Sequence, residues 1–312
     1  MSLLKDKKIS ITGGGGFLGR YLIKALKKKK CKYINIVSHK DYDLVNGKDV
    51  KKMYSSQKPD IVFHLAAAVG GIEINQKNPG KFFFENAIMN LQVIHEGFIN
   101  KVEKIINTGT VSCYPNNSPI PFVEKNIWNG YPEEANAPYG IAKRIMHVQS
   151  ESYKKQYNFN SIMLLLTNLY GPEDNFDKKS SHVIAALIRK FFEAKKNNKK
   201  EVIVWGDGKA TRDFCYVEDI ANGLVLAAEK YNDSYPLNLA SGKEIRIKDL
   251  ALIIKKKIGF EGKIVWDKTK PTGPKRRLVS INKAKKLIGF KPYVSIEKGL
   301  ENTIKWYQKK RR

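Results

Sequence analysis

The chain has 312 residues, of which 42% are hydrophobic and 11% aromatic, so it can bury a core and is not disordered throughout. Lysine and arginine together number 57 against 30 acidic residues, which gives a formal net charge of +27. Such an excess is found in nucleic-acid-binding proteins, but only nine of the 57 are arginines, and the lysines are spread along the chain in short runs. We therefore interpret the charge as a solvated surface and expect no nucleic-acid partner.

The sequence also gives no indication of a targeting segment or of a metal site. No apolar run reaches membrane-spanning length and charged residues begin at Lys5, so we expect neither a signal peptide nor a membrane anchor. Cys31, Cys113 and Cys215 lie far apart with no metal-ligand spacing. This pattern predicts no metal site and no disulfide framework, and it favours the reducing cytoplasm.

Strands alternate with helices along the first half of the chain. Short apolar runs predict strands at residues 9–12, 33–37, 60–67, 104–107 and 161–166. Helical stretches between them indicate an α/β fold, a Rossmann-type doubly wound parallel sheet. Beyond Pro172 the elements become shorter, which indicates a smaller C-terminal α+β part. We expect domains at residues 1–172 and 173–312, with some crossing of the chain between them.

A glycine-rich loop follows the first predicted strand. Gly13, Gly16 and Gly19 are spaced G-x-x-G-x-x-G and come directly before a helix. Glycines permit a tight turn and the close approach of a pyrophosphate, which the N-terminus of the helix then binds. The position between strand and helix favours a dinucleotide site over an ordinary turn.

The turn after the second strand is small and basic. Ser38, His39 and Lys40 stand where an NAD site would carry an acid that binds the ribose. A basic residue there accepts the 2′-phosphate of NADP, so we expect NADPH as the cofactor, with Asp43 near the adenine. For Lys40 taken alone, a solvated turn explains the pattern equally well.

A third motif combines hydroxyl groups with a lysine. Tyr139 and Lys143 are four residues apart on a helix that Pro138 begins, and Thr110 follows the strand at residues 104–107. Because a nearby ammonium favours the phenolate, we expect the pKa of Tyr139 to fall toward neutrality. Such a tyrosine exchanges a proton with a sugar hydroxyl or ketone.

Together these motifs resemble the GDP-L-fucose synthase family of extended short-chain dehydrogenase/reductases that act on nucleotide sugars. The resemblance spans nearly the whole chain. Its supporting segments are residues 64–72, 128–134, 136–143, 167–176, 181–184 and 204–208, with Arg212 and the closing residues 299–307.

The resemblance implies a reaction in two stages. One site epimerises C3 and C5 of GDP-4-keto-6-deoxy-D-mannose, and NADPH then reduces the C4 ketone to give GDP-L-fucose. It implies that Thr110, Tyr139 and Lys143 serve the reduction and that His182 is the acid of the epimerisation.

The resemblance also implies binding residues and an assembly. The implied cofactor-binding residues are Gly13, Gly14, Gly15, Gly16, Phe17, Leu18, Gly19, Ser38, His39, Lys40, Asp43, Ala66, Ala67, Thr108, Lys143, Leu166, Asn168, Leu169 and His182. The implied substrate-binding residues are Asn168, Lys190, Trp205, Arg212 and Thr272. Core packing is the alternative for Trp205. The family forms homodimers through the helices that follow the Asn86 and Tyr139 segments.

The sequence departs from the family at one catalytic position. The epimerising cysteine of the family falls on Ser112, and Cys113 stands one residue later. A serine needs an activating partner to act as a base, and adjacent side chains point to opposite sides of an extended chain. We therefore expect reduction to be robust and epimerisation to be slowed, restricted to one carbon or rerouted through Cys113.

Three interpretations remain open. The first is an enzyme that both epimerises and reduces, and the surrounding motifs favour it. The second is a reductase or epimerase for another GDP-linked 6-deoxy or heptose sugar. The third is a protein without enzymatic activity that binds NADP or nucleic acid, which the complete catalytic set disfavours.

Overall fold

The computed structural model describes residues 3–70, 77–178, 180–270 and 273–311. Its larger part is a six-stranded sheet in the order β2-β1-β3-β4-β5-β9, and every neighbouring pair of these strands is parallel. The strands are β1 (Lys8–Thr12), β2 (Tyr33–Val37), β3 (Ile61–His64), β4 (Lys104–Thr110), β5 (Ser161–Leu166) and β9 (Leu237–Leu239). The expected doubly wound α/β fold is confirmed.

Helices cover both faces of this sheet. The helices on one face are α1 (Phe17–Lys28), α7 (Val217–Lys230) and α9 (Asn282–Ile288). Those on the other face are α2 (Gly47–Gln57), α4 (Pro79–Ile99) and α5 (Ala137–Tyr157). Successive strand residues point to opposite faces, so Ile61 and Phe63 pack against α1 and α7 while Val62 packs on the other side. Alternation of strand and helix in the sequence therefore produces two apolar layers.

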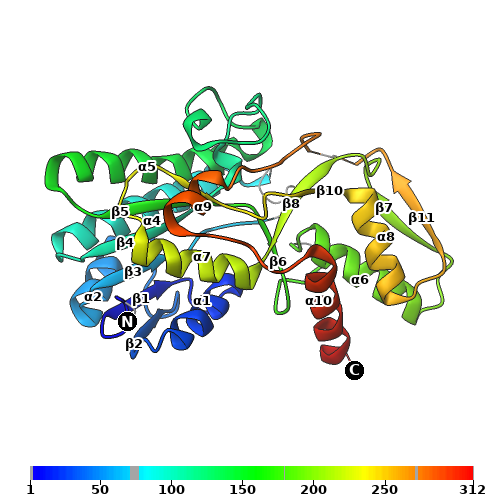
Figure 1. Ribbon diagram of the computed structural model, residues 1–312, viewed down its shortest axis with the longest axis horizontal. Coiled ribbons are helices and arrows are strands. Elements are labelled where there is room, and N and C mark those ends of the chain that lie inside the picture. The colour runs from blue at the N-terminus through cyan, green and yellow to red at the C-terminus, as the bar shows by residue number, and fades with distance from the viewer. Residues whose placement is uncertain (1–2, 71–76, 179, 271–272, 312) are drawn as a thin grey trace.

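The smaller part of the molecule lies beside the sheet (Figure 1). Its strands form a three-stranded sheet of β6 (Asn168–Tyr170), β8 (Thr211–Tyr216) and β10 (Glu244–Arg246), and a pair of β7 (Glu201–Trp205) with β11 (Lys263–Asp267). Its helices are α6 (Val183–Lys196), α8 (Ile247–Ile258) and α10 (Ile296–Lys310), which enclose a third apolar core.

The chain crosses between the two parts more than once. After β6 and α6 have begun the smaller part, α7 and β9 return to the larger part, where β9 pairs with β5. Strands of the large sheet lie on both sides of residue 172, since β9 follows it and the other five strands precede it. The expected domain boundary between residues 172 and 173 stays a prediction.

One strand is shorter than the sequence indicates. We expected a strand at residues 60–67, but β3 ends at His64. The buried Asn86 side chain accepts a hydrogen bond from the N–H of Ala68 (3.1 Å) and donates one to the oxygen of Ala68 (2.8 Å). These bonds hold the chain after β3 against α4, outside the strand ladder.

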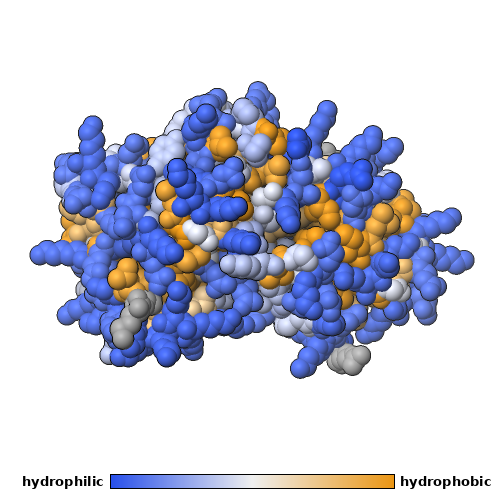
Figure 2. Space-filling model, viewed as in Figure 1, coloured by the Kyte–Doolittle hydropathy of each residue, from blue (hydrophilic) through white to orange (hydrophobic). Residues whose placement is uncertain are grey.

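Figure 2 shows that one face of the molecule is largely hydrophilic. Long hydrophilic side chains are spread over this whole face, with apolar residues between them. Within the described residues, no helix is long and apolar enough to cross a membrane.

Candidate active site

The glycine loop joins β1 to α1 as a tight turn. Gly13 has a φ of +69°, and a Cβ on it would lie 2.9 Å from the nitrogen of Ala66. A Cβ on Gly19 would lie 2.5 Å from the oxygen of Gly13, and the N–H of Gly16 donates to that same oxygen (3.0 Å). Side chains at Gly13 and Gly19 would therefore push the turn away from β3 and α1.

The open side of this loop fits the phosphates of a dinucleotide. A Cβ on Gly15 would meet nothing within 4 Å, and no side chain caps the N-terminus of α1 at Gly16. The first N–H groups of the helix and its partial positive charge are thus available to an anion. Phe17 and Leu18 begin the helix and pack against the core below the loop.

The basic turn lies next to the glycine loop. In the parallel register Thr12 pairs with Val37, so Ser38 follows β2 where Gly13 follows β1. His39 and Lys40 are exposed. The Asp43 carboxylate accepts from the N–H of Val45 (3.0 Å) and lies 3.8 Å from Nδ1 of His39, so it braces the turn.

Most other candidate cofactor residues lie along the same edge of the sheet. Ala66 and Ala67 follow β3, Thr108 lies in β4, and Thr110 pairs with Leu166 where β4 and β5 end. Carboxyl ends of parallel strands are where ligands bind in open α/β sheets. Asn168 and Leu169 continue into β6, and the Asn168 amide donates to the oxygen of Asp213 (3.2 Å).

Tyr139 and Lys143 lie one turn apart on α5. The Lys143 side chain is only 1% exposed, and its Nζ lies 6.0 Å from the centre of the Tyr139 ring. Burial lowers the pKa of Lys143 to about 8. Burial also raises the pKa of Tyr139, with a further contribution from Cys113, so the expected fall in this pKa is wrong. Withdrawal from water opposes the phenolate more strongly than the ammonium favours it, so the phenol of Tyr139 stays neutral.

A buried hydrogen-bond network that sequence reasoning missed holds Lys143. Asn90 on α4 donates to the oxygen of Ala142, and its Oδ1 lies 3.0 Å from Nε2 of His64 and 3.5 Å from Nζ of Lys143. On the other side of the His64 ring, Nδ1 lies 2.8 Å from Oγ1 of Thr12.

Burial and the charge of Lys143 lower the pKa of His64 to about 3, so the ring is neutral. Because Oδ1 of Asn90 can only accept, we assign the proton of His64 to Nε2. The network thus presents an oxygen to the Lys143 ammonium. The only sequence signal was a polar pair, His64 and Asn90, within apolar segments.

The turn after β4 buries Cys113. Residues 111–113 form a short 3₁₀ helix in which Cys113 is 0% exposed and its thiol donates to the oxygen of Gly140 (3.4 Å). Burial raises the pKa of Cys113 to about 11, so the thiol stays protonated. This burial argues against a proton transfer through Cys113, and the catalytic roles expected of Ser112 and Cys113 stay predictions. Ser112 is half-buried, and its N–H donates to Oγ1 of Thr110 (3.2 Å).

His182 lies at the N-terminus of α6 and its side chain is exposed. Nearby protein withdraws part of the ring from water, which lowers the pKa of His182 and favours the neutral imidazole. Among the described residues, no hydrogen bond joins His182 to Thr110, Tyr139 or Lys143. Its role in epimerisation therefore stays a prediction.

The candidate nucleotide-binding residues gather in the smaller part. Trp205 at the end of β7 is 51% exposed, which rules out core packing, and Nζ of Lys190 lies 5.7 Å from its ring centre. Nζ of Lys190 also donates to the oxygen of Ile203 (2.9 Å). An open indole beside an ammonium suits a base and its phosphates.

Arg212 lies on β8, and its guanidinium donates to the oxygen of Pro274 (2.7 Å). Burial lowers the pKa of Arg212 to about 10, and the neighbouring Arg277 adds to this effect. Arg277, which sequence reasoning missed, forms an ion pair of 2.6 Å with Glu133, four residues before α5 begins at residue 137. Thr272 lies outside the described residues.

No group of three or more His, Cys, Asp or Glu residues in the described part of the chain could hold a metal ion.

Comparisons with known proteins agree with this geometry. Residues 9–240 match the NAD dependent epimerase/dehydratase family. A GDP-L-fucose synthase of Sinorhizobium fredii is 39% identical over 300 residues, which cover 96% of this chain and 95% of that protein.

Two solved structures have the same fold. A GDP-6-OMe-4-keto-L-xylo-heptose reductase from C. jejuni superposes with a TM-score of 0.92 and 28% identity, covering 99% of this chain and 100% of that one. A GDP-L-fucose synthetase from Naegleria fowleri bound to NADP gives a TM-score of 0.91 and 28% identity, covering 100% of this chain and 95% of that one.

The family match confirms the prediction of a dinucleotide-dependent enzyme, and the NADP of the Naegleria protein agrees with the expected cofactor. The resemblance to GDP-L-fucose synthases is likewise confirmed, by 39% identity to the Sinorhizobium protein over 96% of this chain. This chain belongs to the NAD dependent epimerase/dehydratase family.

Proposed function

We propose that the protein is an NADPH-dependent enzyme that reduces C4 of a GDP-linked 4-keto sugar. With epimerisation at C3 and C5, its overall reaction is the conversion of GDP-4-keto-6-deoxy-D-mannose to GDP-L-fucose. The observation that carries the proposal is the pair of a neutral Tyr139 and a buried Lys143 at the carboxyl edge of the sheet. The identity to the Sinorhizobium GDP-L-fucose synthase supports the choice of sugar.

The side chains divide the reduction between them. NADPH supplies the hydride when it is bound. Tyr139 donates its phenolic proton to the C4 oxygen, and the Lys143 ammonium below a pH of about 8 stabilises the negative charge that results. Oγ1 of Thr110 accepts from the N–H of Ser112, which leaves its own hydrogen for a sugar oxygen.

The smaller part of the molecule supplies the nucleotide site in this proposal. Lys190 and Arg212 offer cationic groups to a diphosphate, and the exposed Trp205 offers a flat surface to a base. Asn168 in β6 lies between the sheet edge and this group, because its amide contacts Asp213, the residue after Arg212.

Turnover with defined sugars tests the proposal. Purified protein is mixed with NADPH and either GDP-4-keto-6-deoxy-D-mannose or a dTDP-linked 4-keto sugar, and NADPH absorbance is followed. We expect rapid oxidation of NADPH with the GDP-linked sugar only. Equal rates with both nucleotides would contradict the assignment of the base, and no oxidation with either would contradict the reductase.

A reductase with lost or altered epimerisation is the second candidate. The buried Cys113 and the serine at position 112 favour it, since neither supplies a thiolate base. Inversion needs a proton donor and an acceptor on opposite faces of the sugar, which His182 alone cannot supply. The likeness to the C. jejuni heptose reductase agrees with this alternative.

Deuterium incorporation separates the two candidates. In deuterated water the second candidate predicts little deuterium at C3 and C5, more deuterium in Ser112→Cys, and no change in Cys113→Ala. If the unmodified protein rapidly incorporates deuterium at both C3 and C5 of the sugar, the complete GDP-L-fucose synthase reaction is established.

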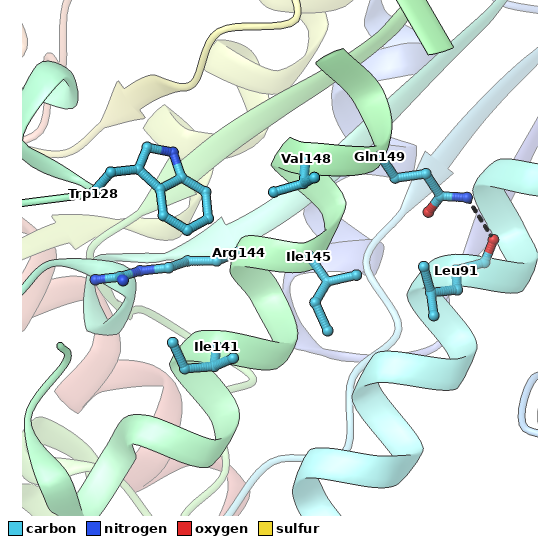
Figure 3. Close-up of a pocket in the computed structure, with 7 residues that line it drawn as sticks. All are labelled: Leu91, Trp128, Ile141, Arg144, Ile145, Val148 and Gln149. Atoms are coloured by element: carbon cyan, nitrogen blue, oxygen red, sulfur yellow. Dashed lines mark hydrogen bonds between the residues drawn. The ribbon is translucent and has the colours of Figure 1, made fainter. Parts of the chain in front are cut away.

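The apolar face of α4 and α5 is our candidate for a homodimer interface. A hollow of about 340 Å³ lies between Trp128 and these helices. Figure 3 shows the residues that line it, which are Leu91, Trp128, Ile141, Arg144, Ile145, Val148 and Gln149. Val148 is 50% exposed, Trp128 46% and Leu91 37%, so exposed apolar side chains gather around this hollow. We expect Val148→Glu to convert a dimer to a monomer in sedimentation analysis.

The three free, buried cysteines suit a reducing cytoplasm.

A further inference from the structure

An ion pair connects the helix of the glycine loop to the start of the smaller part. Arg20 lies in α1, one residue after the last glycine of the loop. Glu173 lies three residues after β6, in the turn that leads toward α6. The proposed reaction gives this pair no chemical role.

The Arg20 side chain binds a backbone carbonyl of the glycine loop. Its Nη1 donates to the oxygen of Gly15 (2.7 Å), the loop residue whose Cβ position is open. A carbonyl held by a guanidinium is not turned toward an anionic ligand, so this bond helps to keep N–H groups on the phosphate side. The orientation of the loop is thus coupled to the position of Arg20.

The remaining donors of Arg20 bind Glu173 at two places. Nε donates to Oε2 of the carboxylate (2.6 Å), and Nη2 donates to the backbone oxygen (2.8 Å). Lys24 adds a bond to Oε1 (3.1 Å), and the Tyr21 hydroxyl donates to the oxygen of Pro172 (3.1 Å). Partial burial opposes ionisation of Glu173, but the bonds from Lys24 and Arg20 outweigh it and lower the pKa.

The turn that Glu173 occupies is braced by its own side chains. Glu173 has a φ of +71°, the left-handed region that a residue with a side chain adopts at a cost. The N–H of Asn175 donates to Oδ1 of Asp174 (2.7 Å), and the N–H of Asp177 donates to Oδ1 of Asn175 (2.9 Å). Displacement at Glu173 therefore carries residues 174–177 with it.

This turn extends toward the candidate substrate site. Phe176 stacks on Tyr307 of α10, with ring centres 4.5 Å apart, and so ties the turn to the smaller part. His182, the candidate epimerisation acid, follows five residues after Asp177.

We propose that Arg20 and Glu173 are positioning residues that couple cofactor binding at the glycine loop to the placement of residues 171–177. When a phosphate orders the loop, Arg20 is fixed through Gly15 and holds Glu173 in its strained conformation. The catalytic meaning of this coupling rests on the proposed function, but its test needs only NADP.

Hydrogen exchange with and without NADP measures the coupling. In the unmodified protein we expect saturating NADP to slow amide exchange of residues 171–177 at least roughly fivefold, the lower end of typical coupling between sites. Glu173→Gln removes the charge at nearly constant shape. Arg20→Lys keeps the charge but loses the planar fork that reaches three acceptors. Both variants should bind NADP and lose most of the protection of residues 171–177.

A matched control lies on the same helix. Lys28 of α1 pairs with Glu218 of α7 at 2.8 Å, against 2.6 Å for Arg20 and Glu173, so Glu218→Gln removes a comparable ion pair from α1 without touching Glu173. This control should keep the full protection. Because Arg20 and Glu173 are both partly exposed, we expect unfolding midpoints to change little in all variants.

The outcomes separate this inference from the proposed function. NADP that binds without protecting residues 171–177, or equal protection in Glu173→Gln and the control, overturns the coupling and leaves the reductase untouched. Protection that is lost in Glu173→Gln and Arg20→Lys supports it, even if no GDP-linked sugar is reduced.

Discussion

Two buried lysines differ in how their ammonium groups are satisfied. Lys104 begins β4 and is 4% exposed, and Lys143 on α5 is 1% exposed. Burial lowers the pKa of both to about 8. Nζ of Lys104 donates to four oxygens at 2.6–3.1 Å, those of Ala227, Ala228, Tyr231 and the Asn232 side chain. For Lys143 the described residues give one contact, 3.5 Å from Oδ1 of Asn90.

We interpret the difference as that between a structural lysine, Lys104, and the lysine that we propose to be catalytic, Lys143. An ammonium has three donors, and those of Lys104 are used up at the C-terminal end of α7, where carbonyl groups and the helix dipole favour a cation. The donors of Lys143 remain for a ligand at the carboxyl edge of the sheet. Similar burial and pKa thus accompany different numbers of hydrogen-bond acceptors, and this difference supports the role that we propose for Lys143.

The largest expected effect is the loss of activity when Tyr139, one turn before Lys143 on α5, is replaced. Tyr139→Phe removes the proton donor and should lower the rate of ketone reduction by about 10² to 10⁴. Binding of NADPH should remain measurable by fluorescence. A rate near normal would show that the proton comes from another group.

Replacing the catalytic lysine should affect activity and not stability. Lys143→Met removes an ammonium with few partners, so we expect reduction to fall about 10²-fold or more while unfolding by urea is unchanged or slightly harder. A loss of stability equal to that of Lys104→Met would contradict the contrast between the two lysines.

The pH dependence follows from the same group. The pKa of Lys143 is lowered to about 8, so the ammonium is present below that pH and lost above it. We expect kcat/KM for reduction to fall as the pH rises through about 8. Lys143→Arg, which stays charged, should remove this fall even where its rate is lower. A flat profile in the unmodified protein would contradict a role for the ammonium.

Replacing the structural lysine should have the reverse effect. Lys104→Met leaves buried carbonyl oxygens of α7 without a donor, and we expect the free energy of unfolding to drop by about 1–3 kcal/mol. The kcat for reduction, measured well below the unfolding temperature, should stay near normal. A specific loss of kcat at full stability would place Lys104 in the catalytic machinery.

The smallest effect concerns cofactor choice. Lys40→Glu places a carboxylate in the basic turn beside the glycine loop and should reduce kcat/KM for NADPH more than that for NADH. Steady-state kinetics with both cofactors measure the ratio. An unchanged ratio would indicate that Lys40 is only a solvated turn residue.

Much of this organisation could be predicted because its signals are local. The glycine spacing at residues 13–19 and the Tyr139–Lys143 spacing each lie within one turn or helix, and the strands appear as apolar runs. Sequence reasoning left open that Cys113 replaces the thiol missing at Ser112, because spacing does not show that Cys113 is buried.

The errors and omissions involve contacts between distant segments. His64 and Asn90 are 26 residues apart, and Arg20 and Glu173 are 153 apart, so no local pattern joins them. The pKa of Tyr139 was predicted in the wrong direction because spacing shows the nearby ammonium but not the loss of water. Burial of an ionisable group depends on the whole fold.

Transfer of deuterium from labelled NADPH tests the central claim most directly. The protein is given GDP-4-keto-6-deoxy-D-mannose with NADPH that carries deuterium in the transferred position, and the product is analysed by NMR. We predict one deuterium at C4, formed by the unmodified protein and strongly reduced in Tyr139→Phe. A product without deuterium at C4, or labelling that is unaffected by Tyr139→Phe, would contradict reduction at the Tyr139–Lys143 site.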